Sequence, residues 1–244
     1  MEIAVVIPSK GRANTILTHK YVANAKVCVA ESEVGEYREV NPNIEYVVHP
    51  DSIVGLVQKR EFIRKKFENV FMIDDDIKGF LRMTQKQGET SKVSPELAYD
   101  VIQNAGNMAK LCGAYLFSFN LLKRPEHYAG HIPLRMSGCI AGCAFGILKG
   151  SDKLIIDPRI KMCYEYFISG LNAFHYRKAF FDDRFSINQD GYGNAPGGAA
   201  AIRTRDVEQQ DMNILKAYFG EAIVQQTDIT KGKKEFDKRL NIPF

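Results

Sequence analysis

Residues 71–77 read FMIDDDI: three apolar residues, three consecutive aspartates and one more apolar residue. Residues 70–73 have the length and composition of a buried strand, so the aspartates begin where that strand ends. Three adjacent carboxylates repel one another, and the repulsion costs free energy unless the group is solvated or neutralised. Their position at the end of a buried run therefore indicates that they bind a ligand.

The segments before this run alternate between strand and helix. Apolar runs predict strands over 2–8, 26–30 and 44–48, and helical spacing predicts helices over 14–25, 31–40 and 56–67. This order is typical of an α/β fold, with a central mostly parallel sheet and helices on both faces. Ligands of such sheets bind at the carboxyl ends of the strands, which is where Pro8, His49 and Asp74 fall.

The second half of the chain is less regular. A helix over 94–112 begins with a Ser94 cap and with Pro95, a favoured first helical residue. Strands are expected over 114–120, 140–148 and 173–181, and helices near 164–171 and over 203–219. Residues 188–201, NQDGYGNAPGGAAA, are too rich in glycine for regular structure and predict a loop.

The composition is that of a globular protein, since the 244 residues are 45% hydrophobic and 25% charged. The net charge of +4 is compatible with a polyanionic partner but does not establish one. No apolar run is long enough to cross a bilayer and the amino terminus lacks a basic leader, so a cytoplasmic protein without a membrane partner is expected. The five scattered cysteines form no CxxC pair, which favours reduced thiols.

Clustered carboxylates at a strand end suit a hard divalent cation, Mn²⁺ or Mg²⁺, of the kind that holds a diphosphate. Alternate residues of an extended segment point the same way, so Asp74 and Asp76 can share one ion while Asp75 faces elsewhere. Cations for the phosphates are available in Arg12, after the first strand, and in Arg60, near the start of a basic helix. The plainer alternative is an acidic loop that caps the next helix.

Three separated motifs carry a family resemblance: IPSKGR at 7–12, a Gly-x4-Arg element formed by Gly55 and Arg60, and IDDD at 73–76. Together they make roughly the first eighty residues resemble a glycosyltransferase of the GT-A fold. The resemblance implies a nucleotide diphosphate-sugar donor, a UDP-sugar first among the candidates, and Mn²⁺ or Mg²⁺ held by Asp74 and Asp76. The residues that it implies for binding the nucleotide sugar are Pro8, Ser9, Lys10, Arg12, His49, Gly55, Arg60, Asp74 and Asp75.

The resemblance also implies an acidic residue at the start of a helix in the second half, often within a Glu-Asp pair that faces the acceptor hydroxyl. The matching residue is Glu165, which lacks the aspartate neighbour because Tyr166 follows it. Glu165 could take the acceptor proton in an inverting displacement. A retaining mechanism would not need this residue as a base. The structural alternative is that Glu165 is a surface residue of the helix. No histidine follows His175, so Asp190, Asn194 or water would replace the late histidine ligand of many such enzymes.

More narrowly, the chain resembles the compact phage and TET-associated glycosyltransferases that modify 5-hydroxymethylpyrimidines in DNA. This resemblance rests on the small size of the chain, the PSKGR opening, the lack of a membrane anchor and a Gly-Gly-x4-Arg element. It implies transfer of a sugar to the hydroxymethyl oxygen of a modified cytosine or uracil in DNA, in the host cytoplasm for a phage-encoded protein. The acceptor-binding residues that it implies are Gly197, Gly198, Arg203 and His175.

On this interpretation residues 1–244 form a single GT-A domain, with a nucleotide-sugar-binding half at 1–85 and an acceptor-binding half at 86–244. A related enzyme acting on a polysaccharide, glycolipid or protein is the first alternative. A non-catalytic DNA-binding relative is the second, and the intact aspartates and Arg60 count against it. A nucleotidyltransferase usually has a glycine-rich signature after the first strand, which SKGR matches poorly. The oligomeric state stays open.

Overall fold

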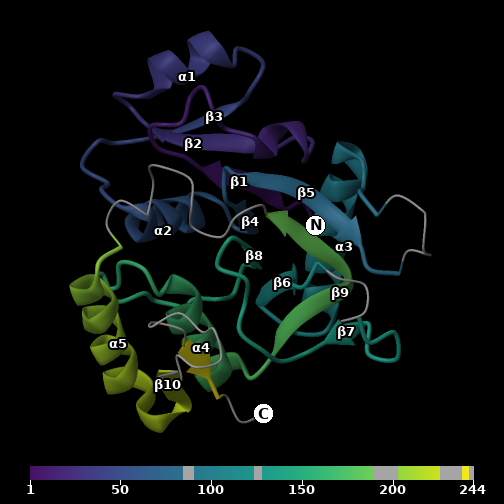
Figure 1. The fold of residues 1–244 in the computed structure, drawn as a ribbon, viewed down its shortest axis with the longest axis vertical. Coiled ribbons are helices and arrows are strands. Elements are labelled where there is room, and N and C mark those ends of the chain that lie inside the picture. Colours follow the sequence, from purple (N-terminus) through teal and green to yellow (C-terminus); the bar gives the residue numbers. More distant parts are fainter. Residues whose placement is uncertain (85–90, 124–127, 190–202, 226–237, 242–244) are drawn as a thin grey trace.

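The computed structural model describes residues 1–84, 91–123, 128–189, 203–225 and 238–241, and Figure 1 shows their fold around a nine-stranded sheet. The strands of this sheet are β1 (Ala4–Pro8), β2 (Lys26–Ala30), β3 (Tyr46–His49), β4 (Val70–Ile73), β5 (Ile77–Arg82), β6 (Leu116–Asn120), β7 (Leu134–Arg135), β8 (Ala144–Ile147) and β9 (Ala179–Gln189). The helical segments are η1 (Thr18–Lys20), α1 (Val34–Val40), α2 (Leu56–Lys66), α3 (Pro95–Leu111), α4 (Tyr164–Tyr176), α5 (Arg205–Phe219) and η4 (Gly220–Ala222). A separate small sheet pairs β10 (Ile223–Gln225) with β11 (Lys238–Leu240).

The order of strands in the large sheet is β3-β2-β1-β4-β8-β6-β9-β5, with β7 paired to β9. β3, β2, β1 and β4 run parallel to one another. The helices α1 and α2 lie in the connections between these parallel strands, as a parallel sheet requires. The segments that follow Pro8, His49 and Ile73 therefore leave the sheet at the same edge.

The second half of the sheet continues this edge with mixed strand directions. β8 is antiparallel to β4 and to β6, β9 is parallel to β6, and β5 is antiparallel to β9. The carboxyl ends of β4, β6 and β9 and the amino ends of β8 and β5 consequently meet at one edge. We call this the aspartate edge, because residues 74–76 follow β4 there.

Two buried cores attach helices to both faces of the sheet. Val5 and Ile7 of β1 belong to a core shared with α1 and α3. Val6, between them, belongs to a second core shared with α2, α4 and α5. Neighbouring residues of β1 serve opposite cores because side chains alternate along a strand. The expected α/β fold is confirmed, and Figure 1 shows α4 beside α5, which lies at the lower left of the view.

The helix expected over 14–25 is wrong, because this stretch holds only the short η1. The backbone N–H groups of Leu17 and Thr18 donate to Asp75 O at 2.9 and 3.3 Å. The Thr18 hydroxyl donates to Asp74 O at 2.6 Å and accepts from Ile77 N at 2.9 Å. These tertiary hydrogen bonds replace the helical ones, so they override local helix propensity. They also tie the loop after β1 to the aspartates.

The strand expected over 173–181 is wrong in its first part. α4 continues to Tyr176, Arg177 ends it with a left-handed φ of 66°, and β9 starts only at Ala179. An apolar aromatic run fits a buried helix as well as a buried strand. β9 also extends through Asn188 and Gln189, which the sequence assigns to the loop; the rest of that loop lies outside the described residues.

The other predicted elements agree with the structure to within a few residues. The sequence does not predict β5, where Gly79 interrupts a short run, nor the short strands β7, β10 and β11. The final helix begins at Arg205, where the Thr204 side chain accepts from Val207 N, rather than at Arg203. All five cysteines are free. Within the described ranges, no helix combines the length and apolar character needed to cross a membrane.

Candidate nucleotide-sugar site

The three aspartates of the aspartate edge have three different sets of partners. Asp75 is the most enclosed, with 6% of its surface exposed. Ser9 Oγ donates to Asp75 Oδ2 at 2.6 Å, and the Arg12 guanidinium pairs with Asp75 Oδ1. Burial raises the pKa of Asp75, and the hydrogen bonds and charge of Ser9 and Arg12 oppose this rise. Asp75 is thereby fixed against the loop that follows β1.

Tyr37 of α1 completes this network. Its hydroxyl lies 2.8 Å from Ser9 Oγ and accepts from the backbone N–H of Arg12 at 2.9 Å. Burial raises the pKa of the Tyr37 phenol, so the hydroxyl stays neutral and can act as donor and acceptor at once. The sequence does not reveal this role of Tyr37, although Tyr37 is the single aromatic residue of the polar segment 31–40. Tyr37, Ser9, Arg12 and Asp75 form what we call the Asp75 network.

Lys59 of α2 holds the backbone of the loop that follows β1. It is buried, with 5% exposed, and its ammonium group donates to the backbone carbonyl of Ser9. Burial lowers the pKa of Lys59, as expected for an ammonium group taken out of water. The sequence places Lys59 in a run of basic residues on the helix, and nothing in that run distinguishes this buried lysine from its solvated neighbours.

Asp74 pairs with Arg60 of α2 instead. Arg60 Nη2 donates to Asp74 Oδ1 at 2.9 Å and to Gly142 O at 2.7 Å. The guanidinium carbon also lies 5.3 Å from the ring centroids of Phe145 and Tyr164, and Arg60 is only 4% exposed. Stacking and hydrogen bonds together hold this cation in one position beside the aspartates.

Asp76 has its own partner across the sheet, since Gln189 Nε2 donates to Asp76 Oδ1 at 3.0 Å. Burial raises the pKa of Asp74 to about 7, Arg60 opposes this rise, and the charges of Asp76 and Asp75 add to it. A second cation would stabilise the ionised form of such a carboxyl group. The paired carboxylates of Asp74 and Asp76 are therefore suited to a divalent ion.

Within the described residues no three Asp, Glu, His or Cys side chains are grouped closely enough to hold a metal ion by themselves. Mn²⁺ and Mg²⁺ often use one or two carboxylates and take their other ligands from water and substrate phosphates. The chemistry of Asp74 and Asp76 fits an ion of this second kind.

Glu165 lies in the first turn of α4, against the segment that leads into β8. A Cβ atom placed on Gly142 would lie 3.1 Å from the carboxyl carbon of Glu165, so the glycine makes room for this group. The carbonyl of Gly142 is also a hydrogen-bond partner of Arg60, which places Glu165 close to the Arg60–Asp74 pair. Burial raises the pKa of Glu165. A carboxyl group with a raised pKa is suited to general-base chemistry near neutral pH.

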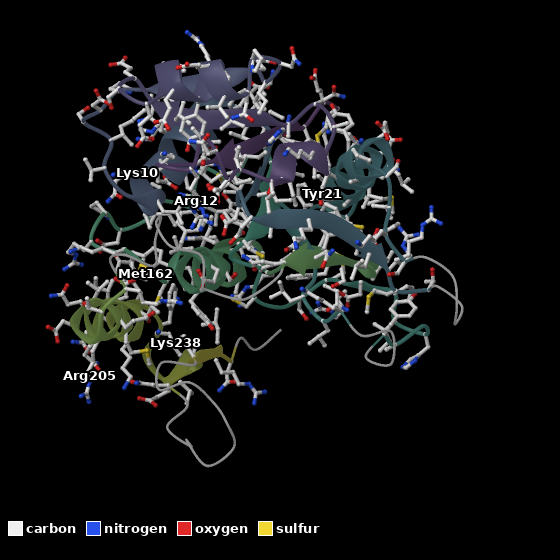
Figure 2. The ribbon with its side chains drawn as sticks, turned by 45° about the horizontal axis from the view of Figure 1, so that its top comes forward. Lys10, Arg12, Tyr21, Met162, Arg205 and Lys238 are labelled. Atoms are coloured by element: carbon white, nitrogen blue, oxygen red, sulfur yellow. The ribbon has the colours of Figure 1, made fainter. Side chains whose placement is uncertain are left out.

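The turn that carries Glu165 is anchored by Asp211 of α5, which is fully buried. The Asp211 carboxylate accepts from the backbone N–H groups of Lys161, Met162 and Cys163 at 3.0, 2.6 and 2.8 Å. Figure 2 shows Met162 on the segment that enters α4, on the side toward α5. A buried carboxylate with three donors is well satisfied, so α5 fixes the start of α4.

Four other residues that the sequence assigns to the nucleotide sugar also lie along this edge. Pro8 ends β1, and Figure 2 shows Lys10 exposed on the loop beyond it, beside Arg12. His49 ends β3 and is buried; its Nδ1 lies 2.9 Å from Pro50 O, and its Nε2 has no hydrogen-bond partner in the described part of the chain. Gly55 precedes α2 with a φ of 98°, which favours glycine.

The residues that the resemblance assigns to acceptor binding do not lie together at the aspartate edge in the described part of the chain. His175 lies ten residues after Glu165 on α4, which is about 15 Å along the helix, so the structure does not bring it to the aspartate edge. Arg203 is partly exposed and its Nε donates to the buried Glu208 at 2.8 Å. Gly197 and Gly198 lie outside the described residues.

Comparison with known proteins supports the fold and the family. A family model described as TET-associated glycosyltransferase matches residues 3–146, which is more than half of the chain. This range includes the Asp75 network, the Arg60–Asp74 pair and Gly142. No curated protein matches the chain.

Two solved structures resemble the whole fold. One is the structure of S. aureus TarS 1–349 in complex with UDP-GlcNAc. The match covers 90% of this chain and 66% of the TarS chain, with 9% identity and a TM-score of 0.54. That of GalNAc-T7 with UDP, GalNAc and Mn²⁺ covers 89% of this chain and 48% of its own, with 11% identity and a TM-score of 0.52. The chain thus spans less than two thirds of the length of either. The expected GT-A fold is confirmed.

Proposed function

Because this chain belongs to the TET-associated glycosyltransferase family, we propose that it transfers a sugar from a nucleotide diphosphate-sugar to the 5-hydroxymethyl group of a pyrimidine in DNA. The observation that carries the proposal is the separation of the three aspartates at the end of β4. Asp75 is bound into the loop after β1, whereas Asp74 pairs with Arg60 and Asp76 with Gln189. In this proposal Asp75 serves the nucleoside, and Asp74 and Asp76 serve the phosphates.

The donor would lie along the aspartate edge. The loop held by the Asp75 network takes the nucleoside, and Arg60 and the exposed Lys10 neutralise the phosphates. Both structural relatives were solved with a uridine nucleotide, one with UDP-GlcNAc and one with UDP, GalNAc and Mn²⁺. A UDP-sugar is therefore the first donor to test.

Asp74 and Asp76 would hold Mn²⁺ or Mg²⁺ together with the diphosphate. When bound, such an ion neutralises the negative charge that develops on the departing diphosphate. The protein supplies the rest of the charge balance through Arg60, which is already oriented by Gly142, Phe145 and Tyr164. An arginine fixed before substrate arrives costs little to reorganise during the reaction.

Glu165 would act as the base. Its carboxylate takes the proton of the acceptor hydroxyl, the hydroxyl oxygen forms a bond to the anomeric carbon, and the bond from that carbon to the diphosphate oxygen breaks. The nucleoside diphosphate leaves with the bonding electrons, and the anomeric centre is inverted. The anchored first turn of α4 keeps the Glu165 carboxyl group in position for this step.

A transfer assay tests the proposal. The protein is incubated with Mn²⁺ and a panel of UDP- and GDP-sugars, and with DNA that carries cytosine, 5-hydroxymethylcytosine or 5-hydroxymethyluracil. The DNA is then digested to nucleosides and weighed by mass spectrometry. The proposal predicts a gain of one sugar residue on a hydroxymethylated nucleoside and none on cytosine.

The controls separate the donor from the acceptor. Release of nucleoside diphosphate that depends on metal, with no sugar on any DNA, would support a glycosyltransferase with a polysaccharide, glycolipid or protein acceptor. If the protein neither binds nor cleaves any of the donors in the presence of metal, the glycosyltransferase activity is contradicted and a non-catalytic relative is favoured.

A further inference from the structure

A cavity of about 450 Å³ lies at the carboxyl end of β6, apart from the residues proposed to bind the donor. Phe119, Asn120, Arg135 and Phe181 are among its lining residues. We propose that this cavity receives the target pyrimidine after the base has been extruded from double-stranded DNA. The inference rests on the proposed function, because it names the place where the acceptor of that reaction binds.

Part of the cavity lining lies at the aspartate edge, because Asn120 ends β6 and Leu121 and Leu122 follow it. β8 separates β4 from β6 and is antiparallel to both, with Ile73 opposite Ala144 and Ser118 opposite Phe145. The ends of β4 and β6 are therefore two strand spacings apart, about 10 Å. A base in the cavity would lie within reach of a sugar whose diphosphate is held by the residues after β4.

The cavity also adjoins the proposed base. Cys139 and Ala141 line it, and Cys139 Sγ donates to the backbone carbonyl of Glu165 at 3.7 Å. Gly142, the next residue along the chain, makes room for the Glu165 carboxyl group. The segment 139–142 therefore forms a shared wall between the cavity and the reaction centre, where a hydroxymethyl group would have to be placed.

The planar Arg135 guanidinium offers a flat face to a heteroaromatic ring. It lies 4.5 Å from the centroid of the buried Phe181 ring, and 41% of the Arg135 side chain reaches solvent. Arg135 also pairs with Asp183, with Nη2 donating to Oδ1 at 3.0 Å. This pair offers donors and an acceptor at the margin of an apolar space. Enzymes that act on an extruded base recognise it by stacking and by hydrogen bonds to its edge.

The rim of the cavity carries the observation that favours DNA over a small free acceptor. Leu121, Leu122 and Ile132 are 46%, 53% and 49% exposed, and all three line the cavity. Large apolar side chains gathered on a rim expose surface that a partner would bury. Proteins that unstack DNA insert such side chains between bases, and the unstacking costs a few kcal/mol per step. We assign the wedge role to Leu121 and Leu122.

Two variants separate the cavity from the wedge. Ala129 is an exposed lining residue, so Ala129→Trp fills the cavity without disturbing the core, and Ala129→Ser is its size control. The double variant Leu121→Ser/Leu122→Ser removes the wedge. Leu111→Ser is its control, because Leu111 is 81% exposed and precedes the amino end of β6, at the opposite edge of the sheet.

Transfer is measured with the full chain, Mn²⁺, a UDP-sugar and 5-hydroxymethylcytosine in duplex and in single-stranded DNA. Ala129→Trp should raise KM for both DNAs about tenfold or more, while KM for the UDP-sugar changes less than about twofold. The wedge variant should lower transfer to duplex about tenfold and to single-stranded DNA less than about threefold, because no stacked partner has to be displaced there.

The outcomes are distinct. If the wild-type protein modifies DNA and Ala129→Trp does so with an unchanged KM for DNA, the cavity assignment is overturned and the proposed function stands. If the wedge variant loses duplex and single-stranded transfer equally, the wedge assignment is overturned. If the wild-type protein cleaves UDP-sugars but transfers nothing to either DNA, the proposed acceptor fails, and this inference fails with it.

Discussion

Arg60 Nη2 donates to Asp74 Oδ1 at 2.9 Å, and this bond joins the basic helix α2 to the acidic end of β4. The two partners differ in exposure, with 4% of the Arg60 side chain and 29% of the Asp74 side chain reaching solvent. The arginine is therefore enclosed beside the carboxylate, whereas the aspartate has surface left for a ligand. The site is built so that its cation is fixed and its carboxylate is accessible.

A double-mutant cycle tests this pair. Arg60→Met should lower the free energy of unfolding by about 2 kcal/mol, because the aspartates then lack their nearest cation. Asp74→Asn should cost less, and the double variant should show a coupling of about 1 kcal/mol, reduced by the partial exposure of Asp74. Urea unfolding of the four proteins gives these values. Additive losses would show that the pair is not coupled.

Tyr37→Phe tests the Asp75 network. The change removes the hydroxyl that contacts Ser9 Oγ and accepts from Arg12 N, so it should weaken nucleotide binding about threefold to tenfold and cost about 1–2 kcal/mol of stability. Tyr46→Phe is the matched control, because the Tyr46 hydroxyl donates to the carbonyls of Tyr37 and Asn41 in the same core. Calorimetric titration with UDP should separate the two variants. Equal binding by both would exclude the network from nucleotide recognition.

The pH dependence of transfer tests Glu165. A base must be ionised, and burial raises the pKa of Glu165, so kcat/KM should rise with pH and level off above a pKa higher than the ordinary value of about 4.3. Glu165→Gln should lower kcat about a thousandfold and abolish this acidic limb. Glu221→Gln, which changes an exposed glutamate after α5, should keep the wild-type kcat and the acidic limb of the pH profile. A Glu165→Gln enzyme with the wild-type pH profile would point to a retaining mechanism.

Asp211→Asn tests the anchoring of α4. An amide at this position presents N–H groups to the backbone donors of Lys161, Met162 and Cys163, so stability should fall by about 2–3 kcal/mol. The kcat of transfer should also fall, because the turn that carries Glu165 is released. Asp206→Asn, in the exposed first turn of α5, is the control. A stability loss without a loss of kcat at a temperature where the variant is folded would limit Asp211 to a structural role.

Much of the fold and of the site can be predicted from the sequence, because the first half of the chain obeys local rules. Each apolar run up to β4 becomes a parallel strand, and the strand ends place Pro8, His49 and Asp74 at one edge. Arg60 is recognisable because it follows a glycine-led helix start next to the acidic run. The resemblance to GT-A glycosyltransferases rests on these same residues.

The rest depends on contacts between distant segments. The stretch around Thr18 is not helical because Thr18 forms hydrogen bonds with Asp74 and Ile77 instead. No local sequence pattern predicts these bonds. Tyr37, Lys59 and Gln189 enter the site from three other elements, so their roles appear only after folding. His175 is the converse case: the resemblance groups it with the acceptor residues, and the structure places it near the end of α4, away from Glu165.

The most direct test of the central claim is calorimetric titration of UDP with and without Mn²⁺, in the wild-type protein and in Asp76→Asn. If Asp74 and Asp76 hold the ion, Mn²⁺ should tighten UDP binding at least about tenfold in the wild type. Asp76→Asn should lose this gain but keep the metal-free affinity, because the nucleoside loop is untouched. Asp152→Asn, on an exposed aspartate, should behave as the wild type. Full metal enhancement in Asp76→Asn would contradict the assignment of the ion to this strand end.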